Sequence, residues 1–122
     1  MIERVRIWGS PWSPAFMDWV FMLKRGDPLS QKWQLIPDDT DAMITHRPPK
    51  GIGDEANLGF KCQKVGCVNR LGRIHQLSLK GHILGHIHED YGEYQQGQTK
   101  LINASICTAR YVPSNAPIVV DI

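Results

Sequence analysis

Two histidines placed two residues apart form the most chemically suggestive group in this sequence. His86 and His88 occur in Gly85-His86-Ile87-His88 and follow an apolar segment that predicts a buried strand over His82–His86. In an extended backbone the side chains at positions i and i+2 point to the same side, so two imidazoles would face one point in space. Neutral imidazole is the commonest metal ligand at neutral pH, and zinc, manganese and iron accept it readily. The pair indicates a metal site, and the alternative is a pair of surface or core histidines.

A third histidine follows another predicted strand. Asp41–Thr45 is a short apolar segment that leads directly into His46. Open α/β sheets place their active residues at the carboxyl ends of strands, which makes His46 a second candidate for chemistry. The alternative is a turn histidine held by Pro48-Pro49.

Strands and helices alternate in the first part of the chain, and strands alone follow. Val65, Val68, Leu71 and Ile74 recur at helical spacing and predict an amphipathic helix that begins near Lys64. Strands are predicted at Arg4–Trp8 and Ile118–Ile122 and a hairpin at Glu93–Ser105, with a short buried segment or helix at Ala15–Met22 and a loop at Lys50–Gly59. This order predicts an α/β or α+β sandwich.

Composition restricts the class of protein without naming a partner. The 122 residues suffice for one domain, and 14 basic against 12 acidic residues give a net charge of +2, far from that of a dedicated nucleic-acid binder. No stretch approaches the roughly 18 apolar residues that span a bilayer. Three cysteines and a polar start, Met1–Arg6, predict reduced thiols and a cytoplasmic protein.

Cys62, Cys67 and the four tryptophans have simpler explanations than a functional site. The two cysteines have no second pair to complete a zinc module, and Cys67 fits the start of the predicted helix. The tryptophans, Trp8, Trp12, Trp19 and Trp33, lie in apolar surroundings, which favours core packing over the stacking of bases.

Five short motifs, taken together and in this order, resemble one protein family. They are Trp8-Gly9-Ser10-Pro11-Trp12, Thr45-His46-Arg47-Pro48-Pro49, Val65-Gly66-Cys67, Gly85-His86-Ile87-His88-Glu89-Asp90-Tyr91-Gly92 and Ile102-Asn103-Ala104-Ser105. The combination is similar to that of the metallophosphoesterase-domain-containing proteins, which belong to the calcineurin-like phosphoesterase superfamily. The resemblance covers nearly the whole chain.

The resemblance implies a fold, two metals and a set of site residues. Residues 1–122 would form a single partial domain, the C-terminal half of a four-layer αββα sandwich. Two divalent ions of manganese, iron or zinc would clamp a phosphoester or nucleotide substrate, with His46 and His86 on one metal and His88 on the other. Asn103 is a candidate substrate contact because it lies on the strand after the histidine loop. Arg47 stands where relatives have glycine, and would either grip a phosphate bidentately or block close approach.

Ligands that the family places ahead of this region are absent from the sequence. These are an Asp-x-His pair, a Gly-Asp that bridges both metals and a Gly-Asn-His-Asp/Glu stretch. The chain alone is therefore predicted to be incomplete as a two-metal phosphoesterase, with the missing N-terminal half or a second copy of the chain as partner. The alternative function is a non-catalytic remnant that binds a metal or nucleotide, or regulates a full-length phosphoesterase.

Overall fold

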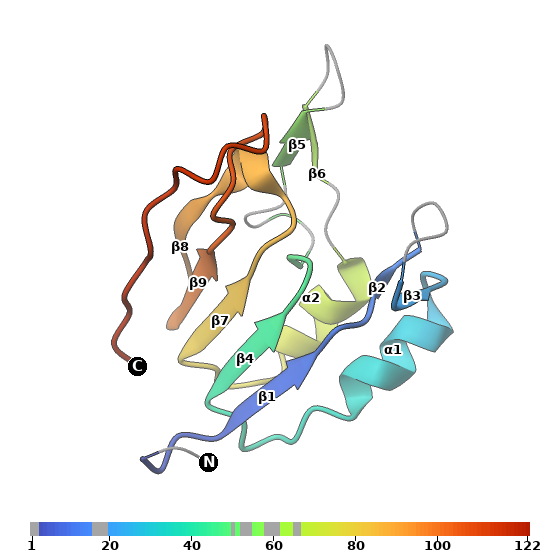
Figure 1. Ribbon diagram of the computed structural model, residues 1–122. Coiled ribbons are helices and arrows are strands. Elements are labelled where there is room, and N and C mark those ends of the chain that lie inside the picture. The colour runs from blue at the N-terminus through green and yellow to red at the C-terminus, as the bar shows by residue number, and fades with distance from the viewer. Residues whose placement is uncertain (1–2, 16–19, 50, 52–54, 58–61, 65–66) are drawn as a thin grey trace.

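A five-stranded mixed sheet forms the centre of the molecule (Figure 1). The computed structural model describes residues 3–15, 20–49, 51, 55–57, 62–64 and 67–122. In spatial order the sheet contains β1 (Ile7–Ser10), β4 (Ala42–Thr45), β7 (Gly81–Leu84), β9 (Thr99–Asn103) and β8 (Gly92–Gln96). The first four strands are parallel to one another and β8 is antiparallel to β9. The predicted α/β class and the hairpin that turns near Gln96-Gly97 are confirmed.

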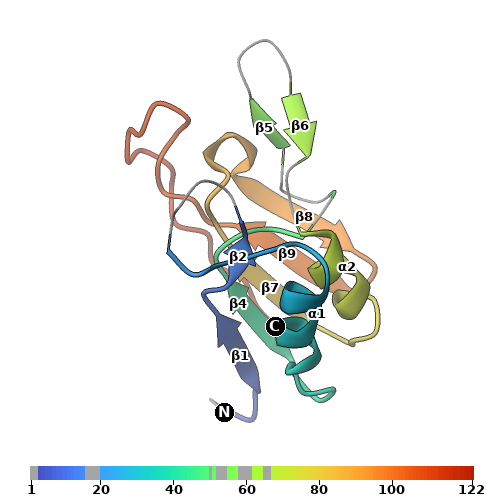
Figure 2. The same cartoon turned by 90° about the vertical axis from the view of Figure 1, so that its right-hand side faces the viewer.

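Two helices cover one face of this sheet. Figure 2 shows α1 (Asp27–Gln34) and α2 (Val68–Ile74) on the same side of the strands, and the two helices contact each other. Pro28 lies in the first turn of α1, where its missing N–H costs no helical hydrogen bond. Between the helices and the sheet lies a core of fully or nearly fully buried residues: Leu29, Trp33, Ile36, Met43, Cys67, Ile74 and Leu79.

The tryptophans pack as predicted wherever they are described. Trp33 is completely buried, and Trp8 and Trp12 are partly buried against the same core. The ring centroids of Trp8 and Trp33 lie 6.4 Å apart in an edge-to-face arrangement that aromatic quadrupoles favour. Trp19 lies outside the described residues.

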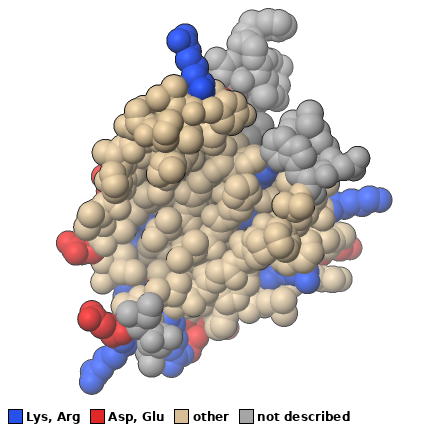
Figure 3. All heavy atoms as spheres, in the orientation of Figure 1, with Lys and Arg blue, Asp and Glu red and all other residues tan. Residues whose placement is uncertain are grey.

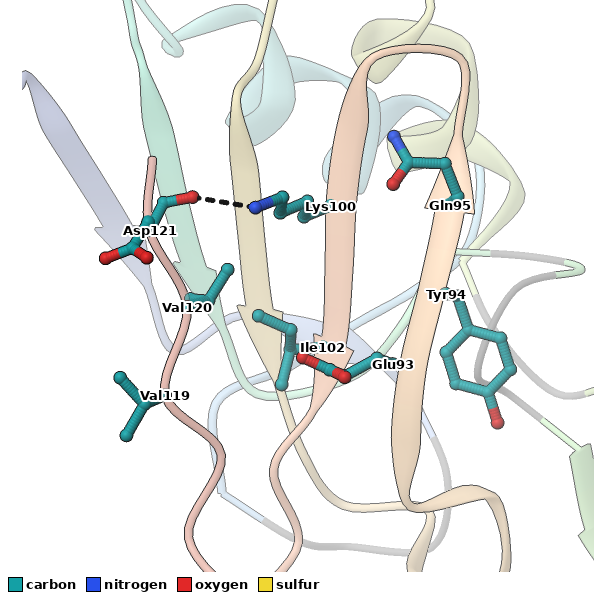
Figure 4. A pocket seen from close by; sticks show the side chains of 8 residues that line it. All are labelled: Glu93, Tyr94, Gln95, Lys100, Ile102, Val119, Val120 and Asp121. Carbon is teal, nitrogen blue, oxygen red and sulfur yellow. Dashed lines mark hydrogen bonds between the residues drawn. The ribbon is translucent and has the colours of Figure 1, made fainter.

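The C-terminal segment crosses the opposite face of the sheet and forms no strand. A strand predicted at Ile118–Ile122 is therefore wrong, because the segment lies over a face, where the sheet offers no hydrogen-bonding edge. A Cβ atom on Gly81 would stand only 3.0 Å from Ile122 Cγ2, which shows how closely the segment approaches β7. Val119, Val120 and Asp121 line a pocket of about 450 Å³ together with residues of β8 and β9. Figure 4 shows the C-terminal segment beside these strands.

The same face is less covered toward β1 and β4. Ile7 and Ile44 remain 43% and 48% exposed, whereas Ile102 on β9 is 2% exposed beneath the C-terminal segment. Figure 3 shows few charged side chains across the middle of the molecule in this view. An apolar strip on the sheet thus lacks a covering layer within the part of the chain that the structure describes.

Two small sheets correct the predictions for the loops. β2 (Ser13–Pro14) pairs in parallel with β3 (Met22–Leu23), and β5 (Glu55–Asn57) pairs with β6 (Cys62–Lys64) in an antiparallel ribbon. A loop throughout Lys50–Gly59 is therefore wrong at Glu55–Asn57. Residues 16–19, which are half of the predicted segment Ala15–Met22, lie outside the described residues.

The starts of the first strand and of the second helix also differ from prediction. Glu3 and Arg4 have φ angles of 48° and 67°, in the left-handed region, so the extended backbone of β1 begins only at Ile7. Lys64 belongs to β6, which moves the start of α2 to Val68. Among the described residues, no helix is long and apolar enough to cross a membrane.

Candidate metal and phosphate site

His46 and His86 come together at the carboxyl ends of two neighbouring parallel strands. β4 ends one residue before His46 and β7 ends two residues before His86. The Gly85 N–H donates to the carbonyl of His46 at 3.0 Å, which joins the two segments directly. The imidazole centroids are 4.7 Å apart with an interplanar angle of 61°. Two imidazole rings therefore lie close together at the carboxyl ends of neighbouring parallel strands, where open α/β sheets bind their ligands.

The backbone around His86 is not the extended strand that the sequence predicted. His86 has φ of 71°, in the left-handed region that residues other than glycine rarely adopt. The Ile87 N–H donates back to the carbonyl of Gly85 at 2.9 Å, which closes a tight turn after β7. The strand prediction over His82–His86 is thus wrong at its last two residues. Backbone strain of this kind is concentrated at functional sites.

His88 stands at the start of a short 3-10 helix, η1 (His88–Asp90), and has different neighbours. Its Nδ1 lies 3.1 Å from the carbonyl of Thr108, and its ring packs at 5.3 Å against that of Tyr111. Donation from Nδ1 to a carbonyl leaves Nε2 as the lone-pair nitrogen, which is how ligating histidines are commonly oriented. The described residues nevertheless contain no group of three His, Cys, Asp or Glu side chains that could hold a metal. Of the three predicted ligands, the structure pairs His46 with His86.

The paired imidazoles are held in the neutral form that binds metals. Burial, followed by the charge of Arg47 and the neighbouring histidines, lowers the pKa of His86 to about 4. The pKa of His46 is also lowered, first by burial and then by the charges of Arg47 and Arg70. Both rings are therefore neutral at pH 7, and the surrounding charge is positive.

Arg47 lies inside the molecule and not at its surface. The residue is only 4% exposed, and burial is the main cause that lowers its pKa, with the charge of Arg25 next. Its backbone carbonyl accepts hydrogen bonds from the hydroxyl of Thr45 at 3.1 Å and from the guanidinium of Arg70. The structure thus places a buried cation beside the histidine pair, and a contact between Arg47 and substrate phosphate stays a prediction.

Arg70 is a site residue that sequence reasoning missed. It is completely buried, and its guanidinium donates to Thr45 Oγ1 at 2.8 Å, to the carbonyl of Arg47 and to the carbonyl of Trp12 at 3.2 Å. It also lies 4.2 Å from the centre of the Trp33 ring, a cation–π distance. Burial lowers its pKa to about 10. Arg70 thereby ties α2, the end of β4 and the loop after β1 into one unit.

The sequence did contain a signal for the burial of Arg70. Cys67 and Ile74, three residues before it and four residues after it, are both buried. Residues at that spacing share one face of a helix, so an arginine between them had to be buried or to extend past the apolar face.

A second buried residue supports the segment that bears His46. His82 on β7 is completely buried, and its Nε2 lies 2.9 Å from Thr45 Oγ1. Burial, and then the charge of Arg70, lowers the pKa of His82 to about 3, so this ring is neutral. Thr45 is therefore held by Arg70 from the helix and by His82 from the next strand.

The side chain of Asn103 holds the loop that contains His86 and His88. It is completely buried, its Nδ2 donates to the carbonyl of Ile87 at 2.8 Å, and its Oδ1 accepts from the hydroxyl of Ser105 at 2.7 Å. The amide thus fixes the one residue that separates His86 from His88. A direct contact between Asn103 and substrate stays a prediction, whereas its contact with this loop is observed.

Similarity to curated proteins bears out the resemblance in the sequence motifs. The chain is 48% identical over 122 residues to human Metallophosphoesterase domain-containing protein 1, a match that covers 99% of this chain and 37% of the relative. This chain is homologous to the metallophosphoesterase domain-containing proteins. Two Caenorhabditis elegans relatives, UPF0046 proteins T07D4.2 and C25E10.12, are 41% and 33% identical over 97% of the chain, which covers 29% and 42% of them. No family model matches the chain.

The homology confirms the resemblance that the motifs indicate, and the match is restricted to part of the relatives' length. The chain spans about a third of the length of the first relatives that it matches. Their name implies a metal-dependent phosphoesterase site, and the neutral His46 and His86 rings fit one side of such a site. The described residues supply no anionic bridging ligand beside them.

Proposed function

We propose that this chain carries the histidine side of a metal-dependent phosphoesterase centre, with His46 and His86 as ligands of one divalent ion and His88 of a second. The observation that supports it best is the pairing of two neutral imidazoles, 4.7 Å apart, at the carboxyl ends of β4 and β7. A metal bound there would polarise a phosphoryl oxygen and generate a hydroxide nucleophile near neutral pH. Manganese, iron and zinc all suit such a donor set.

The protein residues have distinct parts in this proposal. His46 and His86 present their lone pairs, and the Thr108 carbonyl orients His88 through its Nδ1. Arg47 and Arg70 lower the pKa of His46, and in this proposal their positive charge favours an anionic group bound nearby. Asn103 holds the loop between His86 and His88. The substrate class is an anionic phosphoester, a phosphodiester or a nucleotide, because the positive charge around the histidine pair favours an anionic ligand.

The proposal extends to the fold and to a partner. The five-stranded sheet is one of the two central sheets of a four-layer sandwich, and residues 1–122 are a partial domain. Helices cover only one of its faces, and Ile7 and Ile44 remain 43% and 48% exposed on the other. A further protein layer, from a preceding half of the domain or from a second copy of the chain, covers these residues and adds the acidic metal ligands.

Metal binding tests the proposal without requiring turnover. Calorimetric titration of the chain with Zn²⁺ or Mn²⁺ is expected to show binding that His86→Ala weakens at least tenfold. His75→Ala removes an exposed histidine outside the site and serves as the matched control, with unchanged affinity. Equal affinity in the chain and the His86→Ala variant would refute the assignment of the ligands.

The second candidate function is a non-catalytic protein that binds a metal or nucleotide or regulates a full-length phosphoesterase. The absence of a three-ligand group among the described residues favours it for the chain on its own. Hydrolysis of a chromogenic phosphodiester with added Mn²⁺ separates the two. Activity that His86→Ala abolishes would identify a working centre, whereas metal binding without hydrolysis would identify the non-catalytic form.

A further inference from the structure

A tight turn next to His88 presents one aromatic side chain to solvent. The hydroxyl of Thr108 accepts the backbone N–H groups of Arg110 at 3.3 Å and Val112 at 3.4 Å. The Thr108 N–H donates to the carbonyl of Val112, and the Tyr111 N–H donates to the carbonyl of Thr108, each at 2.9 Å. Four hydrogen bonds thus organise residues 108–112, and the conformation of Tyr111 is set by the turn.

The turn holds Tyr111 in an unusual backbone conformation. Its φ angle of 61° lies in the left-handed region, which a bulky residue rarely adopts. The side chain is 79% exposed, although it is large and partly apolar. Backbone strain of this kind clusters at active sites and ligand clamps.

Tyr111 and its turn contact the candidate ligand His88 in two ways. The Tyr111 ring lies 5.3 Å from the His88 ring at 76°, and the carbonyl of Thr108 lies 3.1 Å from His88 Nδ1. The far end of the turn is anchored as well, because the amide of Asn115 donates to the carbonyls of Ser105 and Cys107 at 2.8 and 3.2 Å. The exposed phenol is therefore fixed beside the proposed phosphoester centre.

The geometry suits a flat group attached to a bound phosphate. An exposed aromatic face next to a phosphate site can stack against a nucleobase or an aryl ring. Such stacking does not depend on hydrogen bonds to a particular base. An aliphatic group gains less from the same ring, because it has no π surface. We propose that Tyr111 is a stacking surface that selects phosphoesters bearing a planar aromatic group; this inference rests on the function proposed above.

Ligand titrations compare probes that separate the ring from the phosphate. Dissociation constants are measured by NMR on the chain in the presence of Zn²⁺, following the amide signals of residues 108–112. Adenosine 5′-monophosphate and phenyl phosphate carry an aromatic group, and ribose 5-phosphate does not. Either aromatic probe is expected to bind roughly tenfold more tightly than ribose 5-phosphate, within the range of base–aromatic stacking. The relative affinity of the two aromatic probes shows whether a nucleobase or a simple aryl ring is preferred.

Three variants test how much the Tyr111 ring contributes to the binding of the probes. Tyr111→Asn removes it but tolerates the left-handed backbone, and is expected to bring all three probes within about twofold of one another. Tyr111→Phe keeps the ring and should retain the preference. Val119→Ser changes an 88% exposed residue on the C-terminal segment over the sheet and should change none of the three constants. Equal binding of the aromatic and non-aromatic probes to the unaltered chain, or equal loss for all three in Tyr111→Asn, would overturn the inference.

Adenosine without phosphate and without metal tests the stacking surface independently of the phosphoester centre. It should shift the Tyr111 ring signals of the unaltered chain at millimolar concentration, and an absence of any shift would refute the stacking surface. If adenosine shifts these signals while ribose 5-phosphate with Zn²⁺ shows no binding, the stacking surface stands and the proposed phosphoesterase function fails.

Discussion

Acidification should destabilise the chain through His82, a histidine that contacts no solvent. Its imidazole is completely buried with Nε2 on the Thr45 hydroxyl, and burial lowers its pKa from 6.5 to about 3. Because the folded pKa is below the unfolded one, the stability from neutral His82 is complete above pH 6.5 and is lost as the pH falls toward 3. Each pH unit in that window costs about 1.4 kcal/mol, so lowering the pH from 7.5 to 5 removes about 2 kcal/mol.

Urea denaturation at the two pH values measures this loss. With chelator present and an m-value of about 2 kcal/mol/M, the His82 contribution lowers the midpoint by about 1 M urea. Glutamine at position 82 does not titrate. Between pH 7.5 and 5, the loss in free energy of unfolding should therefore be smaller in His82→Gln than in the unaltered chain, by about 2 kcal/mol. His75→Gln, at an exposed position, should keep the full pH dependence. The same loss in His82→Gln as in the unaltered chain would refute the argument from burial.

Three further changes test the support of the site. Arg70→Ala removes a buried donor to the carbonyl of Trp12 and one of the donors to the carbonyl of Arg47, and should lower the free energy of unfolding by about 3 kcal/mol in urea denaturation, whereas Arg70→Met, which fills the space without a charge, should cost less. Asn103→Ala should cost about 2 kcal/mol by the same assay and weaken Zn²⁺ binding in calorimetry, because the loop at Ile87 loses its hydrogen bond. Ile44→Asp, on the exposed strip of the sheet, should change the free energy of unfolding of the monomer by less than about 1 kcal/mol but abolish self-association in sedimentation, if a second copy covers that strip.

The pattern of apolar residues sufficed to predict the strands of the sheet and the strand ends at which His46 and His86 lie. Short apolar segments before His46 and before Gly85 predicted β4 and β7, and the Gln96-Gly97 turn predicted the β8–β9 hairpin. These elements depend on local side-chain alternation and turn chemistry, both of which are visible in a sequence. The motifs around them predicted the homology that the comparisons bear out.

Features that depend on long-range contacts were not predictable in the same way. The segment Ile118–Ile122 has the composition of a strand, yet it lies across a sheet face because packing against β7 and β9 decides its place. The left-handed backbone at His86 replaces the extended geometry that His-x-His spacing implied. Arg70 gained its role from contacts with residues distant in sequence, which include the hydroxyl of Thr45 and the carbonyls of Arg47 and Trp12. Tertiary contacts override local propensity at each of these points.

His46 and His86 are expected to bind one metal ion together. Long-range ¹H–¹⁵N NMR spectra of the histidine side chains, recorded at pH 7 while Zn²⁺ is added, test it directly. The imidazole nitrogens of His46 and His86 should shift at the same zinc concentration, while those of buried His82 and exposed His75 stay in place. Shifts confined to His75, or no shift at His46 and His86 at saturating zinc, would show that these two histidines do not share a metal ion.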